Sequence, residues 1–217
     1  MKEWMAYIKE YHKADEVYKK LNIANNHALV DVITKIVEYV KEENIRGTDN
    51  APVYDKAGVV DFLANYPADF KPKKELLKTA FDNNIGDRPF RTTDMNRFPV
   101  ALQEEFKAVF EEYESVQNGL IKFKVNVTRP GDIVMAHYDS PASLAYGIPY
   151  EQTHLEHRLL IFMTEWQNGQ VVQMGNDLLQ WKKYDAVKWS IKNCMHGGAN
   201  FGFDERIAFV VSWVQKE

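Results

Sequence analysis

The sequence predicts an α+β protein in which a helical N-terminal layer packs on a C-terminal antiparallel β-sandwich or barrel. Apolar residues recur at helical spacing in the first half of the chain. From residue 119 onward apolar and polar residues alternate, and Asn–Gly and Gly–Asn–Asp turn signals separate the segments. The chain has 217 residues, 45% of them hydrophobic, which is enough apolar surface for a core. We therefore expect one domain, mainly helical over 1–118, with a β-barrel core over 119–217 that carries any metal site.

Helical periodicity is clearest over residues 28–41, where apolar side chains recur at i, i+3, i+4 and i+7. Asn25 and Asn26 can cap the start of this helix, and Gly47 fits its end. Residues 83–97 are punctuated by Asn, Gly and Pro, which favours a loop or short extended pieces. Further helices are expected over 5–22, 56–65, 73–82 and 100–116.

Strand periodicity begins at Gly119, after which Ile121, Phe123 and Val125 alternate with polar residues. Such alternation is typical of a strand with one buried face. A Pro-Gly-Asp turn follows this strand. Several short strands at close spacing indicate an antiparallel sandwich or barrel. The later strands are expected over 133–136, 157–164, 170–174, 178–182, 186–190 and 206–214.

Composition narrows the possible chemistry and partners. The 27 Lys and Arg residues against 31 Asp and Glu give a net charge of −4, which provides no broad field for a nucleic acid. The lone Cys194 excludes an intramolecular disulfide and every CxxC zinc or redox motif, so any metal must be held by His and carboxylates. No apolar run approaches the roughly 20 residues of a membrane span, and the N-terminus is unlike a signal peptide. We expect a cytoplasmic protein that acts on a small molecule or peptide, with no indication of its oligomeric state.

A candidate metal site combines residues from three places in the second half of the chain. His137 and Asp139 stand two residues apart at the end of an apolar strand, where such side chains share a face and can reach one ion. His196 follows 59 residues later, and Arg206 opens the last apolar strand. Two His and one carboxylate form the facial triad of non-haem Fe(II) oxygenases, which leaves three metal positions open. A 2-oxo acid and O2 can take those positions, and a guanidinium can hold the second carboxylate of the acid.

The segments that carry these residues resemble the Fe(II)/2-oxoglutarate-dependent oxygenase superfamily. Residues 129–139 (RPGDIVMAHYD) resemble its strand that begins with Pro-Gly and ends in His-x-Asp. Residues 189–200, followed by Arg206, resemble its distal His, a following Asn and its 2-oxoglutarate arginine. The order of the pieces is similar to the aspartyl/asparaginyl β-hydroxylase-like branch, which includes free-proline hydroxylases. The resemblance covers about residues 119–214 and leaves 1–118 without a counterpart.

The resemblance implies a double-stranded β-helix, or jelly-roll, that hydroxylates an unactivated C–H bond of an amino acid, a protein side chain or a small metabolite. It implies Fe(II) held by His137, Asp139 and His196, with conversion of 2-oxoglutarate and O2 to succinate and CO2. Arg206 would hold the 2-oxoglutarate C5 carboxylate. Asn200 would either hydrogen-bond the co-substrate or shape the turn that contains it.

The sequence departs from the resembling proteins in two places. Many of them have Arg-x-Ser, whose hydroxyl also holds the co-substrate, whereas Arg206 is followed at that spacing by Ala208. Another hydroxyl, or none, therefore assists the arginine. Some members of the β-hydroxylase branch lack the carboxylate ligand that Asp139 supplies here, so the superfamily fits better than the branch.

Residues near the predicted ligands are candidates for substrate binding. Tyr138 and Tyr146 flank the entrance to the predicted metal site. Arg158 either reaches into the barrel, to bind substrate or the oxo acid, or has a structural role. The loop at 140–156 is long for a barrel connection and follows the ligand pair directly, which favours a lid.

Other interpretations of the same residues stay open. His154 and Glu156 with His196 form a rival His-x-acid set, although no turn leads into it. His154 and His157 are spaced i, i+3, so on a strand they face opposite sides. Cys194 is either a thiolate ligand beside His196 or a buried small residue, and His12 and His27 in the helical half are expected to be surface or cap residues. At the level of function, the alternatives are a metal-dependent cupin-like enzyme without 2-oxoglutarate and a non-catalytic jelly-roll binding protein.

Overall fold

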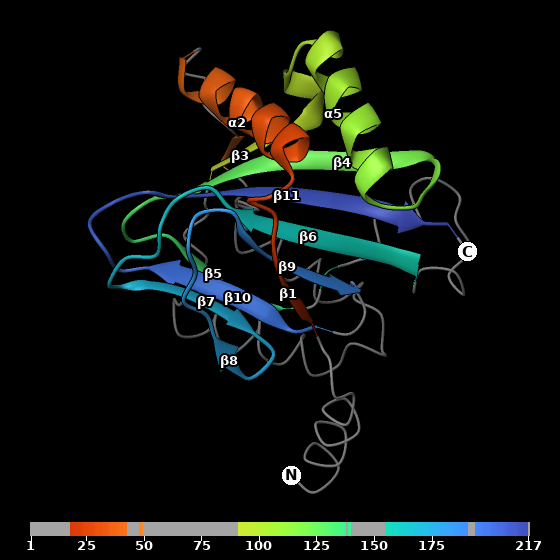
Figure 1. Cartoon of the computed structure of the whole chain (residues 1–217). Coiled ribbons are helices and arrows are strands. Elements are labelled where there is room, and N and C mark those ends of the chain that lie inside the picture. Colours follow the sequence, from red (N-terminus) through yellow and green to blue (C-terminus); the bar gives the residue numbers. More distant parts are fainter. Residues whose placement is uncertain are drawn as a thin grey trace, which may run out of the picture.

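The computed structural model describes residues 18–42, 48–49, 91–137, 139, 155–190 and 194–216 (Figure 1). The elements in the first half of the chain are β1 (Lys19–Asn22), α2 (His27–Glu42), β2 (Thr48–Asp49), β3 (Arg91–Asp94), the short 3-10 helix η2 (Met95–Arg97) and α5 (Val100–Tyr113). The second half contributes β4 (Val116–Thr128), β5 (Ile133–His137), β6 (Glu156–Phe162), β7 (Gln170–Met174), β8 (Asp177–Leu178), β9 (Asp185–Ser190), β10 (His196–Asn200) and β11 (Arg206–Gln215).

The described strands form two antiparallel sheets that face each other. The large sheet has seven strands in the order β1-β9-β6-β11-β4-β3-β2, and the small sheet has four in the order β5-β10-β7-β8. Successive strands from β4 to β7 alternate between the sheets, β7 and β8 stay together, and β9 to β11 alternate again. The first and last strands of this set, β4 and β11, pair along most of their length. This winding is the double-stranded β-helix, or jelly-roll, that the sequence predicted.

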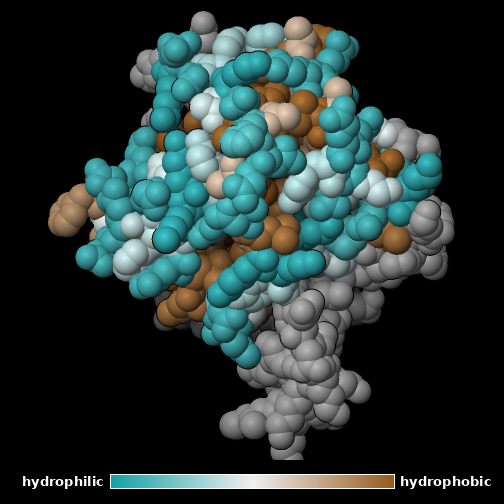
Figure 2. All heavy atoms as spheres, viewed as in Figure 1, coloured by the Kyte–Doolittle hydropathy of each residue, from teal (hydrophilic) through white to brown (hydrophobic). Residues whose placement is uncertain are grey.

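The helices α2 and α5 lie side by side on the outer face of the large sheet (Figure 1). Apolar side chains of both helices meet those of β4 and β11 in one buried cluster. The ring of Phe106 on α5 lies 4.8 Å from Phe123 of β4 and 5.2 Å from Phe209 of β11, measured between centroids. The surface seen in Figure 2 is mainly hydrophilic, with apolar side chains visible in gaps between polar ones. No helix in the described ranges is long and apolar enough to cross a membrane.

Each central strand of the large sheet has two buried faces of different character. On β4, Phe123 and Val125 face the helices, whereas Lys124, Asn126 and Thr128 line a pocket between the sheets. A second apolar cluster, which includes Phe162, Trp181 and Trp189, fills part of the space between the sheets. The alternation on β4 is therefore as predicted, but its polar face borders a pocket.

The predicted helices over 28–41 and 100–116 are confirmed as α2 and α5, although α5 ends at Tyr113 because β4 begins at Val116. The predicted helix over 5–22 is wrong over residues 19–22, and its residues 5–17 lie outside the described residues. Residues 19–22 form β1, in which Leu21 is the register partner of Ala186 on β9. Pairing with a sheet edge thus outweighs a weak helical pattern. The predicted helices at 56–65 and 73–82 lie outside the described residues.

Most predicted strands of the second half are confirmed within two residues, but 178–182 is reduced to the short β8. Strand β10 is not among the predicted strands, because Asn200, at its end, is expected to lie in a turn. Glycines carry no side chain, so they give no alternating pattern. Here they lie in β10, an interior strand of the small sheet. Glycine is required at position 197 because a Cβ atom there would lie 2.9 Å from the backbone of Ala136.

The aromatic cluster beneath α5 predicts a large stability effect. Phe106→Ala removes a fully buried ring and is expected to lower the free energy of unfolding by about 3–5 kcal/mol. Phe203, which is 97% exposed, provides the matched control, because Phe203→Ala should change stability by less than about 0.5 kcal/mol. Urea unfolding followed by circular dichroism measures both values. Equal stabilities of the two variants would contradict this account of the helix–sheet core.

Candidate functional site

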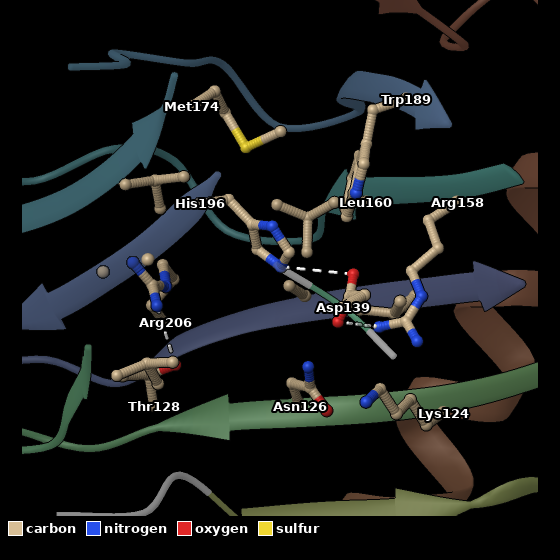
Figure 3. A pocket seen from close by; sticks show the side chains of 16 residues that line it. Lys124, Asn126, Thr128, Asp139, Arg158, Leu160, Met174, Trp189, His196 and Arg206 are labelled. Carbon is tan, nitrogen blue, oxygen red and sulfur yellow. Dashed lines mark hydrogen bonds and ion pairs between the residues drawn. The ribbon is translucent and has the colours of Figure 1, made fainter. Parts of the chain in front are cut away.

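A pocket of about 110 Å³ lies between the two sheets and is lined by residues of seven strands (Figure 3). Three of its lining side chains are cationic, namely Lys124, Arg158 and Arg206. Among the described lining residues, Asp139 is the only carboxylate. Apolar side chains such as Leu160 complete the walls. The pocket therefore combines a low-polarity wall with an excess of positive charge.

His196 and Asp139 meet in the middle of the pocket. The Nδ1 atom of His196 lies 3.1 Å from the Cys194 carbonyl oxygen, which can only accept, so Nδ1 carries the proton. The Nε2 atom lies 3.4 Å from Oδ2 of Asp139. In the neutral imidazole this places a nitrogen lone pair opposite a carboxylate oxygen. Either a second proton on the imidazole or a metal cation satisfies both atoms, so these residues fit a metal site.

His137 is the register partner of His196 across the antiparallel pair of β5 and β10. The register of the two strands shifts between His196 and Gly198, just beyond this pair. The side chain of His137 lies outside the described residues, as do Tyr138, Tyr146 and most of the predicted lid. Accordingly, the described side chains contain no group of three His, Cys, Asp or Glu residues that could hold a metal.

Arg206 lies at one end of the pocket, at the start of β11. Its guanidinium donates to the Val171 carbonyl at 2.8 Å and to the Thr128 hydroxyl at 3.0 Å. Burial lowers its pKa to about 10, and the carboxylate of Asp132 opposes that effect, so the group stays charged at neutral pH. A Cβ atom at Gly198 would lie 2.7 Å from the Val171 carbonyl oxygen, so glycine is needed where β10 approaches β7 beside the arginine.

Thr128 is a hydroxyl beside Arg206 that the sequence reasoning did not identify. The two residues are register partners on β4 and β11, far apart in sequence. In space the Thr128 hydroxyl accepts a hydrogen bond from the Arg206 guanidinium at 3.0 Å. Only the strand pairing reveals this neighbour.

Asn200 does not line the pocket. Its side chain is completely buried, and its amide nitrogen donates to the carbonyls of Thr128 at 2.9 Å and Asp204 at 2.8 Å. Its amide oxygen accepts from the Gly202 N–H at 3.0 Å. Of the two roles left open for Asn200, these hydrogen bonds favour the one that shapes the chain between β10 and β11 rather than contact with a co-substrate.

Arg158 and Lys124 lie at the opposite end of the pocket from Arg206 (Figure 3). Arg158 reaches into the barrel, where its Nη1 atom pairs with Oδ1 of Asp139 at 2.6 Å. Burial and the positive charge of Arg158 lower the pKa of the Lys124 ammonium, and the carboxylates of Asp139 and Asp94 oppose this. Lys124 was not recognised from the sequence. The alternation along its strand predicts one buried face, which leaves the side of Lys124 unburied, whereas the structure places that side on the pocket.

The competing metal ligands occupy other surroundings. His157 lies on the opposite face of β6 from Arg158 and packs its ring on Trp213 at 5.5 Å. Glu156 is buried but is not among the described residues that line the pocket, and His154 lies outside the described residues. Cys194 is fully buried, and burial raises the pKa of its thiol to about 12, which keeps it protonated and favours a packing role.

Comparison with known proteins supports the fold rather than a family. The sequence matches no family model and no curated protein. Among solved structures, the chain is similar to the non-haem α-ketoglutarate-dependent carbocyclase SnoK of nogalamycin biosynthesis, with a TM-score of 0.56, 10% identity, and coverage of 96% of this chain and 82% of that one. It is also similar to a prolyl-4-hydroxylase of Pseudomonas putida, with a TM-score of 0.51, 10% identity, and coverage of 98% and 99%. At this identity, the chain shares their fold.

The hydrogen bonds of Asn200 predict a structural phenotype. Asn200→Ala removes three hydrogen bonds, two of which are to the buried Thr128 carbonyl and Gly202 N–H, and is expected to lower the free energy of unfolding by about 2–4 kcal/mol. Asn96→Ala, at an exposed site on η2, should leave stability nearly unchanged. The measurement is urea unfolding of both variants. An unchanged midpoint for Asn200→Ala, accompanied by weaker 2-oxoglutarate binding, would support the co-substrate role instead.

Proposed function

We propose that this protein is an Fe(II)- and 2-oxoglutarate-dependent dioxygenase that hydroxylates an unactivated C–H bond. The observation that carries the proposal is the placement of Asp139, His196 and Arg206 in one pocket between the two sheets. The shared fold adds support, because one of the similar structures is described as a prolyl-4-hydroxylase and the other as an α-ketoglutarate-dependent enzyme.

Fe(II) would be held by His137, Asp139 and His196. The hydrogen bond from His196 Nδ1 to the Cys194 carbonyl fixes the ring and leaves Nε2 as the ligating atom. His137 occupies the register position opposite His196. When bound, the iron would supply activation of O2, coupled to oxidation of 2-oxoglutarate to succinate and CO2.

Arg206 would hold the C5 carboxylate of 2-oxoglutarate, and the Thr128 hydroxyl would assist it. The Val171 carbonyl and the Thr128 hydroxyl each accept one guanidinium N–H, which orients the fork before the co-substrate arrives. Because the guanidinium is almost fully buried, it meets a carboxylate in surroundings that strengthen their attraction. Leu160, Met174 and Val210 would keep water from the reacting groups.

A thermal-shift panel tests the proposal with Mn(II) in place of Fe(II). We expect Mn(II) to raise the melting temperature and 2-oxoglutarate to raise it further only when the metal is present. His196→Ala should abolish both shifts, and Arg206→Met only the second. His27→Ala removes an exposed histidine at the start of α2 and serves as the control that behaves like the parent. Succinate formation with Fe(II), ascorbate and 2-oxoglutarate should follow the same pattern.

The panel also separates the alternative functions. A cupin-like metalloenzyme would show the metal shift without the 2-oxoglutarate shift. A non-catalytic jelly-roll protein would show neither. If succinate forms at the parental rate in both His196→Ala and Arg206→Met, the proposed site is wrong.

Thr128 provides a finer test of the co-substrate site. Thr128→Val keeps the shape of the side chain but removes the hydroxyl, and is expected to weaken 2-oxoglutarate binding by about tenfold. Thr128→Ser restores a hydroxyl and should recover most of the affinity. Titration calorimetry of the Mn(II)-loaded proteins measures the two dissociation constants. Equal affinities for the valine variant and the parent would remove Thr128 from the co-substrate site.

A further inference from the structure

The pocket has two cationic ends that lie well apart. Thr128 on β4 is the register partner of Arg206, and Lys124 precedes Thr128 by four residues on the same strand. At a strand rise of roughly 3.4 Å per residue, the Lys124 backbone lies about 13–14 Å from that of Thr128. Figure 3 shows Arg158 beside Lys124 at this second end, with Asp139 and His196 between the ends. A group held by Arg206 therefore leaves the second end to another ligand.

The second end presents hydrogen-bond donors that the described part of the protein leaves unused. Arg158 on β6 and Trp189 on β9 are register partners, and both line the pocket. Within the described residues, the buried Nε atom of Arg158 and the buried indole Nε1 of Trp189 have no hydrogen-bond partner. The Lys124 ammonium makes neither a hydrogen bond nor an ion pair with any described residue. Because unpaired buried donors are costly, this arrangement indicates a ligand that brings acceptors.

The charges at the second end indicate that this ligand is anionic. Asp139 is the only carboxylate among the described lining residues, and it already contacts both Arg158 and His196. The proposed iron would be a dication bound to that same carboxylate. Bound 2-oxoglutarate, a dianion, would direct its C5 carboxylate to Arg206. Even when the carboxylate of Asp94, the register partner of Lys124 on β3, is counted, positive charge remains in excess around Lys124 and Arg158, and the proposed metal site does not neutralise it.

We propose that Lys124, Arg158 and Trp189 bind a carboxylate of the primary substrate, so that the substrate is a small organic acid. This inference rests on the proposed function, whose substrate class it specifies. The planar guanidinium already uses one edge for Asp139 and offers its Nε–H to a second carboxylate, which also receives the ammonium and indole donors. The pocket volume of about 110 Å³ suits a small acid, whereas a protein substrate could bring such a carboxylate only on an Asp or Glu side chain or at its C-terminus.

The test uses trifluoroacetate as the probe and ¹⁹F NMR as the readout. The full-length protein is titrated without metal, and its apparent affinity is taken from line broadening of the probe. Trifluoroacetamide, which is similar in shape but neutral, is the control ligand and should not bind. Lys124→Met should weaken trifluoroacetate binding by about tenfold or more, and Lys124→Arg should restore most of the affinity. Lys41→Met removes an exposed lysine at the end of α2 and should match the parent.

Three results would overturn the inference: no binding by the parent, equal binding by Lys124→Met and the parent, or binding that is lost in Arg206→Met but kept in Lys124→Met. The unaltered protein is also tested for the Mn(II) and 2-oxoglutarate thermal shifts. If those shifts are absent while trifluoroacetate binding depends on Lys124, the proposed function fails and the anion site stands. If the shifts occur and Lys124 has no effect, only the substrate inference fails. Circular dichroism of each variant checks that a loss of binding is not a loss of folding.

Discussion

The structure depends on the fact that the central strands of the large sheet are covered on both faces. The helices cover one face, and the small sheet covers the other. Because side chains alternate along a strand, each strand sends one set of residues to the helical core and the next set toward the small sheet. A shift of one residue in register would exchange the aromatic core residues with the charged pocket residues. The register that packs the core therefore also places the pocket side chains.

The two faces of the large sheet are stabilised by different interactions. Phe123 and Phe209 stack against each other beneath α5, in a layer that gains its stability from apolar burial. On the opposite face, the same two strands present Thr128 and Arg206. Their burial is tolerated because the Arg206 guanidinium donates a hydrogen bond to the Thr128 hydroxyl. The apolar layer holds the strands rigid, which allows the pocket to keep partners at fixed positions without a dense polar network.

Pairing within the small sheet decides where the candidate ligands lie. Strand β10 pairs with β5 on one side and β7 on the other, and the close approach of these strands requires glycine at positions 197 and 198. The same approach brings the His137 backbone level with His196. The charged side chains follow an order along the pocket. Among the described lining residues, the single carboxylate, Asp139, lies between two cationic ends. That distribution suits a cation in the middle and anions at either end.

The sequence by itself determined the local periodicities and the types of reactive residue. It predicted the helix over 28–41 and most strands of the barrel. It also predicted that one site combines His137, Asp139, His196 and Arg206. It did not determine that both faces of β4 are covered, that 19–22 would pair with β9, or that a glycine pair would lie in a central strand of the small sheet. Those outcomes depend on what covers each strand. Alternation defines two faces, but only the neighbouring layers decide that Lys124 and Thr128 lie inside the protein and contribute to its site.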